Sequence, residues 1–287
     1  MDNELIYEYS DELNDDFANN KINKKSLNDN YNYFSKNPFF HLASFLFRYL
    51  IAIPVLWFMD VFIFRVRFKN KKVLKKAKKK GYYVYSNHVL PLDPVIPPVM
   101  TNLTKFMVIV ASHDTFSINP IVSFLVKCLG AIPVPSNMKM YKNYTTCMSY
   151  HIKKKHRILI YPEAHIWPYY TGIRNFKSSS FRYPFDDNAP CFAFTTTFKK
   201  SKFFKKPSKV VYIDGPFYPN KELERVEGVN KLRDHVYEAM VARSKTIGNY
   251  SYIKYIKKVL KKIKHHSWKL LLFFAKIELS EEKKQWI

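Results

Sequence analysis

Glycine and cysteine are scarce in this chain. Among its 287 residues there are six glycines, and no glycine-rich stretch of the kind that cradles a nucleotide phosphate is present. The three cysteines, Cys128, Cys147 and Cys191, stand far apart and form no CxxC pair. This spacing argues against a disulfide framework and against a cysteine zinc site, so we expect reduced cysteines in a protein that faces the cytosol.

Acidic residues are also few. The chain has 48 Lys and Arg against 23 Asp and Glu, a formal net charge of +25, and residues 1–20 hold seven of the acids and no base. Such a positive field attracts nucleic acid, an anionic bilayer surface or a phosphorylated substrate. Residues 1–20 lack the basic region and the apolar region that are typical of a signal peptide. Residues 1–36 are polar without a sustained period, and we predict a mobile acidic tail.

Residues 37–68 are mostly apolar. Arg48 and Asp60 interrupt this segment, and Pro54 is expected to kink it. The uninterrupted apolar stretch, 49–59, is shorter than the roughly 20 residues needed to cross a bilayer. We therefore predict a kinked, membrane-seated helical segment in one leaflet. A buried core helix and a tilted span are the alternatives.

Between residues 69 and 250, short apolar runs alternate with helical segments. This alternation predicts a single α/β domain with a mostly parallel central sheet flanked by helices. The expected strands are 81–87, 157–163, 189–198 and 209–215, and the expected helices are 116–130 and 220–245.

Two lysine-rich segments flank the domain. Residues 69–80 carry eight lysines around a few apolar residues, and within 251–287 the lysines lie opposite isoleucines and leucines at helical spacing. We predict a short basic helix and a basic amphipathic C-terminal helix, both suited to an anionic bilayer surface. A solvated charged face is the alternative.

The sequence "YSNHVLPLDP", residues 85–94, places His88 five positions before Asp93 at the end of an expected strand. In an open α/β sheet, ligands bind at that end of the strands. His88 can take a proton from a hydroxyl group if Asp93 holds its other ring nitrogen. Taken alone, the pattern fits a catalytic base with its orienter and, equally, a structural histidine on a turn.

Four further segments follow in a characteristic order: "GAIPV" (130–134), "YPEAH" (161–165), "NFKSSSF" (175–181) and "APCFAF" (189–194). Together with "NHVLPLD" they resemble the motifs of the lysophospholipid and glycerolipid acyltransferase superfamily, whose first motif is NHxxxxD. The resemblance covers residues 60 to 215, approximately. It implies an O-acyltransferase of the 1-acylglycerol-3-phosphate type in phospholipid biosynthesis. Such an enzyme moves a fatty acyl group from acyl-CoA or acyl carrier protein to the hydroxyl of a lysophospholipid-like acceptor.

The resemblance also implies roles for single residues. His88 would deprotonate the acceptor hydroxyl, Asp93 would orient His88, and Glu163 would help to bind the acceptor's polar head. We place Asn87 and His165 in the acceptor site as well. No covalent acyl-enzyme, cofactor or metal is expected, and the active site is expected on the cytoplasmic side of a membrane.

The third motif departs from the family pattern. Ala164 and Ile166 stand where a glycine and a phosphate-binding arginine are usual, and the second motif lacks its arginine. Either Arg174 and Lys177 substitute, since cations of this kind can reach a phosphate, or the acceptor is not a simple glycerol phosphate. A non-catalytic basic protein that binds membrane or nucleic acid is the alternative function. No nucleic acid partner is expected, because the lysines cluster on apolar, aromatic-rich helices.

Overall fold

The domain is built on a seven-stranded sheet. A computed structural model describes residues 5–17, 31–35 and 37–258. Neighbouring strands of the sheet are parallel except the pair β7 and β8, which confirms the mostly parallel sheet predicted from the sequence. In spatial order the strands are β2 (Arg67–Lys69), β8 (Ser208–Phe217), β7 (Cys191–Lys199), β3 (Tyr82–Ser86), β6 (Arg157–Ile160), β4 (Met107–Ala111) and β5 (Ala131–Pro133).

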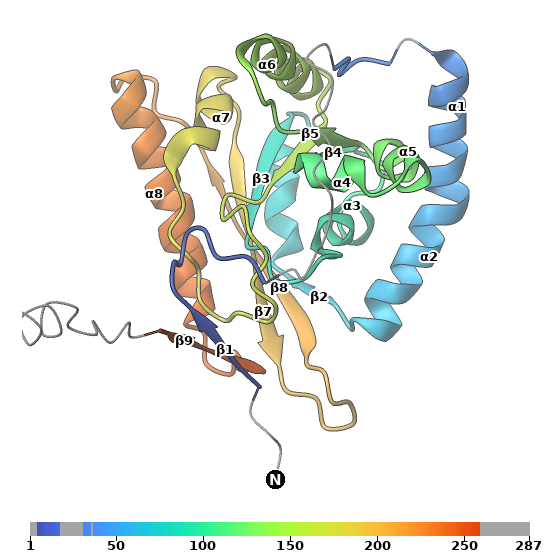
Figure 1. Cartoon of the computed structure of the whole chain (residues 1–287). Coiled ribbons are helices and arrows are strands. Elements are labelled where there is room, and N and C mark those ends of the chain that lie inside the picture. The colour runs from blue at the N-terminus through green and yellow to red at the C-terminus, as the bar shows by residue number, and fades with distance from the viewer. Residues whose placement is uncertain (1–4, 18–30, 36, 259–287) are drawn as a thin grey trace, which may run out of the picture.

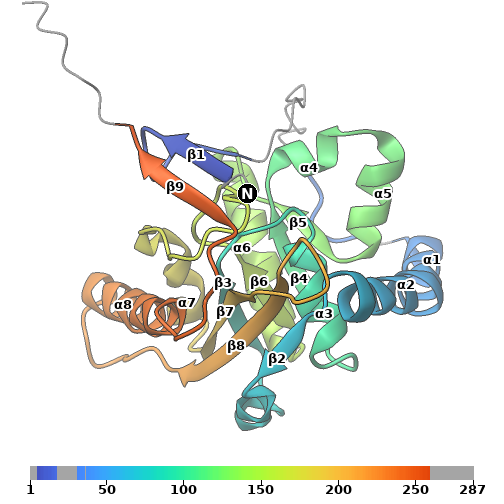
Figure 2. The ribbon, with the colours of Figure 1, turned by 90° about the horizontal axis from the view of Figure 1, so that it is seen from below.

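Strand β3 shows why the sheet is buried on both faces. All of its side chains are buried, with Tyr83 and Tyr85 in one hydrophobic core and Tyr82 and Val84 in the other. Alternate residues of a strand point to opposite faces, so a strand covered on both faces is a continuous apolar run. Helices lie on both faces of the sheet (Figures 1 and 2). They are α3 (Ile96–Met100), α4 (His113–Ser117), α5 (Pro120–Cys128), α6 (Met138–Lys153), α7 (Arg182–Asp186) and α8 (Arg225–Ser244).

Two expected helices differ in detail from the structure. The helix expected at 116–130 is divided into α4 and α5, because the Asn119 side chain caps α5 by accepting a hydrogen bond from the Val122 N–H, and Pro120 opens it. In the lysine-rich segment 69–80, a tight helix with three residues per turn runs over Lys71–Ala77. Similar short helices cover Asp93–Val95 and Ser178–Phe181.

The apolar N-terminal segment forms a continuous helix, Pro38–Ile63, which stands along one side of the domain in both views (Figures 1 and 2). Its α-helical parts are α1 (Pro38–Leu46) and α2 (Ile53–Phe58), joined and followed by wider helical turns at Phe47–Ala52 and Met59–Ile63. It is long and apolar enough to cross a membrane, with a mean hydropathy of 1.9 over 18 residues, of which 11% are buried. This outward apolar face is inconsistent with the alternative of a buried core helix.

The polar residues that interrupt this helix face the domain. Arg48 donates hydrogen bonds to the Cys128 carbonyl, the shortest at 2.5 Å, and lies over the Phe106 ring. The Ser44 hydroxyl contacts the Cys128 sulfur at 3.3 Å, and Asp60 is buried. The helix therefore presents its polar side chains to the protein and large apolar side chains, such as Leu50, to its surroundings.

Both ends of the chain differ from the sequence prediction. The mobile tail predicted for residues 1–36 is wrong at Leu5–Tyr9, which form strand β1, and the helix predicted for 251–287 is wrong at Ile253–Lys257, which form strand β9. The two strands pair in parallel, Leu5 with Ile253 and Tyr9 with Lys257 (Figures 1 and 2). Residues 1–4, 18–30 and 259–287 lie outside the described part, so the rest of both predictions stays open.

Aromatic packing explains why these end segments are strands. The Tyr255 ring stacks on Trp167 with centroids 4.8 Å apart. Tyr7 and Phe17 pack edge-on against Tyr255 and stack on each other. In "IKYIK" Lys254 separates Ile253 and Tyr255, and these two alternate residues are the less exposed ones, as in the first half of a half-buried strand. The lysines of this segment had suggested a helical face, but the contact with Trp167 decides its conformation.

Candidate active site

His88 lies just beyond the carboxyl end of β3, and Glu163 lies beyond the carboxyl end of the neighbouring parallel strand β6. Ligand sites of open α/β sheets form at this edge. The His88 N–H lies 3.4 Å from Glu163 Oε2, and the His88 and Tyr161 rings are in contact with centroids 4.3 Å apart. Two motifs that are 75 residues apart in sequence therefore meet at one place.

Asp93 is held in a tight turn beneath His88. Its Oδ2 accepts hydrogen bonds from the Val89 N–H at 2.8 Å and from the Leu90 N–H at 2.6 Å. The same oxygen lies 3.6 Å from His88 Nδ1, longer than a hydrogen bond. Catalytic contacts of this kind are often long without substrate and shorten in its presence. The geometry therefore places Asp93 on the Nδ1 side of the ring and leaves Nε2 for a substrate.

Lys209, on β8, is a third member of this group that the sequence analysis missed. Its Nζ lies 3.0 Å from Asp93 Oδ1, and both residues are buried. Burial raises the pKa of Asp93, but the Lys209 charge, the nearby His88 ring and the hydrogen bond from Lys209 outweigh it, so the pKa lies below its ordinary value. The alternation of side chains along the strand could have indicated that Lys209 points inward. Lys209 lies on the same face of β8 as the core residues Val211 and Ile213.

Glu163 is paired with Arg174 inside the protein. Glu163 Oε1 accepts a hydrogen bond from the Arg174 N–H at 3.0 Å, and Oε2 lies 3.4 Å from Arg174 Nη2, with both side chains 1% exposed. Burial raises the pKa of Glu163 above its ordinary value despite the Arg174 charge. Arg174 also donates to the carbonyls of His165 and Glu12. Its guanidinium therefore holds the loop and the N-terminal segment together.

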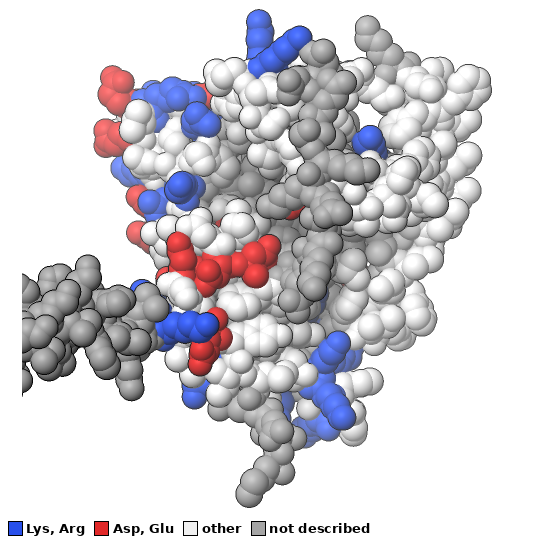
Figure 3. All heavy atoms as spheres, viewed as in Figure 1, with Lys and Arg blue, Asp and Glu red and all other residues white. Residues whose placement is uncertain are grey.

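Residues 11–17 cover the loop that follows Glu163. The Trp167 Nε1–H donates to the Asp15 carbonyl at 2.8 Å, and the Phe17 N–H donates to the Ile166 carbonyl at 3.1 Å. Asp16 lies 3.7 Å from His165 Nδ1. Acidic side chains gather on this face beside β1 (Figure 3). The place of the missing phosphate-binding arginine is thus bordered by an acidic segment.

The other residues expected to bind the acceptor have separate positions. Asn87 is buried, donates from Nδ2 to the Thr196 carbonyl at 3.0 Å and accepts from the Thr196 N–H at 2.8 Å, so its amide joins β3 to β7. Lys177 is not part of the His88 group. It lines a surface groove of about 530 Å³ whose other charged residues are Arg182, Arg225 and Arg233. His165 is next to the site, with 35% of its side chain exposed.

Within the described residues, no group of three His, Cys, Asp or Glu side chains lies close enough to hold a metal ion. The three cysteines are buried and free. Burial raises the pKa of Cys147 to about 12 and raises that of Cys191 well above its ordinary value, which disfavours the nucleophilic thiolate at both positions.

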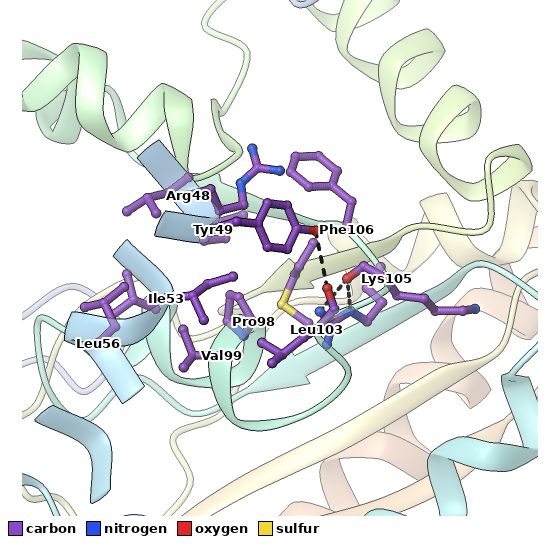
Figure 4. Close-up of a pocket in the computed structure, with 14 residues that line it drawn as sticks. Arg48, Tyr49, Ile53, Leu56, Pro98, Val99, Leu103, Lys105 and Phe106 are labelled. Carbon is purple, nitrogen blue, oxygen red and sulfur yellow. Dashed lines mark hydrogen bonds between the residues drawn. The ribbon is translucent and has the colours of Figure 1, made fainter. Parts of the chain in front are cut away.

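A small apolar cavity of about 30 Å³ lies between the N-terminal helix and the sheet (Figure 4). Tyr49, Ile53 and Leu56 line it from the helix, and Val99 and Leu103 line it from the domain. Its lining includes no residue of the His88 group. The cavity shows how the helix is seated on the domain rather than where the chemistry occurs.

A family model described as acyltransferase matches residues 65–190, a range that contains His88, Asp93, Glu163 and Arg174. Among solved structures, the chain is similar to the 1-acyl-sn-glycerophosphate (LPA) acyltransferase PlsC from Thermotoga maritima, with a TM-score of 0.49 and 12% sequence identity over 72% of this chain and 88% of that chain. No curated protein matches the sequence. Residues 65–190 therefore match the acyltransferase family that the sequence motifs resemble.

Proposed function

We propose that this acyltransferase moves a fatty acyl group from a thioester, acyl-CoA or acyl carrier protein, to the hydroxyl of a lysophospholipid-like acceptor such as 1-acylglycerol-3-phosphate. The observation that carries the proposal is the pair His88 and Asp93 at the carboxyl end of β3. It lies inside the range that matches the acyltransferase family model.

The chemistry follows from the placement of the pair. His88 Nε2 removes the proton of the acceptor hydroxyl while its oxygen attacks the thioester carbonyl carbon. The tetrahedral intermediate collapses, the carbon–sulfur bond breaks, and His88 returns the proton to the leaving thiolate. Asp93, held by the backbone N–H groups of Val89 and Leu90, stabilises the imidazolium that forms between these steps. Direct transfer needs no thiol, which agrees with three buried cysteines.

Glu163 acts in this proposal through the loop it holds. It accepts hydrogen bonds from the Arg174 and His88 N–H groups, and it is buried, so it fixes the acceptor loop against the base. His165, which is partly exposed, contacts the acceptor head. Arg174 supports the same loop from inside the domain. This proposal gives Lys177, which lines a separate groove, and Asn87, which joins β3 to β7, no role in binding the acceptor.

We also propose that the helix Pro38–Ile63 seats the enzyme in the membrane with the active site on the cytoplasmic side. Large apolar side chains, including Phe39, Leu50 and Phe62, are exposed along it, and its polar residues face the domain. Exposed apolar surface of this extent suits a lipid environment. The net charge of +25 favours an anionic bilayer surface.

The test is acyl transfer by the purified full-length chain. Labelled palmitoyl-CoA and palmitoyl-acyl carrier protein are offered with a panel of lysolipids, and products are identified by mass spectrometry. His88→Ala should lower the rate of product formation by about 10³-fold. The matched control is His235→Ala, which removes an exposed histidine on α8 and should leave activity unchanged. Equal turnover by the His88→Ala and wild-type proteins would contradict the mechanism. Absence of any product from wild type would favour a non-catalytic binding protein.

A further inference from the structure

Lys209 is a charged residue inside the domain that the proposed acyl transfer does not require. It lies near the start of β8, which is remote in sequence from the His88 motif, and its side chain is 3% exposed. Its Nζ contacts Asp93 Oδ1 at 3.0 Å, while His88 and two backbone N–H groups share the other oxygen, Oδ2. The carboxylate is therefore held at both oxygens, and the lysine and the histidine lie on different oxygens.

Few other charged or titratable groups face this cluster. On the helix side, Asp60 is buried, its carboxylate oxygens have no hydrogen-bond partner among the described residues, and the Lys209 charge acts on it. The Phe64 ring lies 4.8 Å from Lys209 Nζ. On the β6 side, Tyr161 packs on His88 and Glu163 contacts the His88 N–H. Lys209 is thus the cation that contacts Asp93, with the Glu163–Arg174 pair beyond His88.

A buried lysine in this position has two effects on its neighbours. It keeps the Asp93 carboxylate ionised, because loss of the Asp93 proton creates a favourable ion pair. It also offsets the negative charge that would otherwise stabilise a proton on His88. A base must be unprotonated to accept the acceptor's proton, and an uncompensated Asp93 charge would favour the protonated, inactive form of His88.

We propose that Lys209 is a positioning residue that fixes the Asp93 carboxylate beside His88 and offsets its negative charge. The proposal rests on the proposed acyl transfer, and it deepens that function by adding a third residue to the base. The helix Pro38–Ile63 takes part through Asp60, which lies close enough to Lys209 for their charges to interact.

The direct test is the titration of the His88 ring in the full-length protein. Histidine labelled with ¹³C is followed by NMR in detergent micelles, and the His88 signal is assigned by its loss in His88→Gln. Lys209→Met replaces the lysine with an uncharged side chain of similar length. In this variant the titration midpoint of His88 should move upward by about one pH unit. This is the order expected for removal of one charge across a carboxylate at an effective dielectric constant near 20. An unchanged midpoint would overturn the proposal.

The control variant is Lys105→Met. Lys105 is also partly buried, and burial together with Arg157 and Lys155 lowers its pKa to about 8, but it hydrogen-bonds to the Ala77 and Lys80 carbonyls and not to Asp93. Loss of this lysine should leave the His88 midpoint where it is in wild type. Lys209→Arg retains the charge and should restore the wild-type midpoint. An equal shift in Lys105→Met would assign the effect to general charge or stability, against the proposal.

A second pair of variants tests the same charge effect if Lys209→Met does not fold. Asp93→Asn leaves Lys209 without its partner and should lower the His88 midpoint. The double variant Asp93→Asn with Lys209→Met removes both charges and should return the midpoint toward wild type. Identical midpoints in the single and double variants would contradict a role of Lys209 charge.

Activity supplies an independent arm. With palmitoyl-CoA and the acceptor that wild type uses, the acid limb of kcat/KM against pH should move upward by the same amount in Lys209→Met, with a smaller change in acceptor KM. A shift in the NMR midpoint without acyl transfer by wild type would support the charge arrangement and reject the proposed function. Acyl transfer with an unshifted acid limb would support the function and reject the role of Lys209.

Discussion

The two sides of the candidate active site are built in different ways. The base side, His88 with Asp93 and Lys209, is formed by the turn after β3 and by β8 of the central sheet, and its three members meet inside the domain. The acceptor side, the loop from residue 161 to 174, is held instead by the two ends of the described chain. Strands β1 and β9 meet over this loop (Figure 2).

Under the proposed function, this difference separates the residues that carry the chemistry from those that set the acceptor. The base side is set by short-range hydrogen bonds within residues 88–93 and by one buried lysine. The acceptor side lacks the glycine and arginine of the usual motif. The acidic segment 11–16 contacts His165 and Ile166, at the position where that arginine is usual. We therefore expect mutations on the base side to change the rate of chemistry, and mutations on the acceptor side to change acceptor affinity and local stability.

The largest effect is expected for Asp93→Asn. Loss of the carboxylate removes the group that stabilises the His88 imidazolium, so kcat should fall by about 10³-fold. Stability should also fall, because Lys209 is left buried without its partner. Initial rates with palmitoyl-CoA, together with urea unfolding, measure both effects. Retention of wild-type kcat by a folded variant would remove Asp93 from the mechanism.

Glu163→Gln tests the pair that supports the acceptor side. Arg174 would be left as a buried, unpaired charge, and breaking such a pair costs about 3 kcal/mol. The exposed pair Arg225 and Asp186, with side chains 53% and 50% exposed, is the matched comparison. Arg225→Gln should cost less than about 1 kcal/mol. The free energies of unfolding of both variants are measured by denaturant titration. Equal losses of unfolding free energy in the two variants would contradict the description of Glu163 as a buried support.

Tyr255→Ala tests the attachment of the chain ends to the acceptor loop. The Tyr255 ring stacks on Trp167 and contacts Tyr7, so its removal should weaken the β1–β9 pair by about 1–2 kcal/mol. Faster amide hydrogen exchange in residues 5–9 and a higher acceptor KM are the expected readouts, with kcat nearly unchanged. Phe203→Ala, which removes an exposed ring, is the control. A large fall in kcat without faster exchange would contradict the separation of the two sides.

The smallest effect is expected for Ala164→Gly. Ala164 has a φ of +64°, a left-handed conformation that costs a residue with a side chain about 1–2 kcal/mol. Glycine adopts it freely but loses more backbone entropy on folding. The variant should be more stable by a few tenths to about 1 kcal/mol. Thermal unfolding measures it, and clear destabilisation would show that the Ala164 methyl group has packing contacts that outweigh the strain.

The sequence predicted the base side well because its determinants are local. Strand 81–87, the turn with Pro91 and the spacing of His88 to Asp93 all lie within one short segment, and the structure has the strand and brings the two residues together. Local patterns of this kind are the ones that single-sequence reasoning detects. Lys209 was missed although the strand 209–215 was predicted, because its partner is 116 residues away and only the strand period indicated that it points inward.

The acceptor side was predicted poorly for the opposite reason. Arg174 was one of two candidates to replace the missing phosphate-binding arginines, but the sequence did not show that Glu163 and the Glu12 carbonyl would bind it. The ends of the chain were expected to be a tail and a helix, since their charges conceal the apolar residues that pack on Trp167. Contacts between segments separated by about 150 residues cannot be inferred from the periodicity of either segment.

The most direct test of the account compares the two histidines, one from each side. Steady-state kcat and acceptor KM are measured for wild type, His88→Ala and His165→Ala with labelled palmitoyl-CoA and the lysolipid that wild type acylates. The account predicts that His88→Ala loses kcat by about 10³-fold with little change in KM, and that His165→Ala raises acceptor KM while kcat is retained. A folded His88→Ala protein with wild-type kcat, or an equal loss of kcat in His165→Ala, would contradict it.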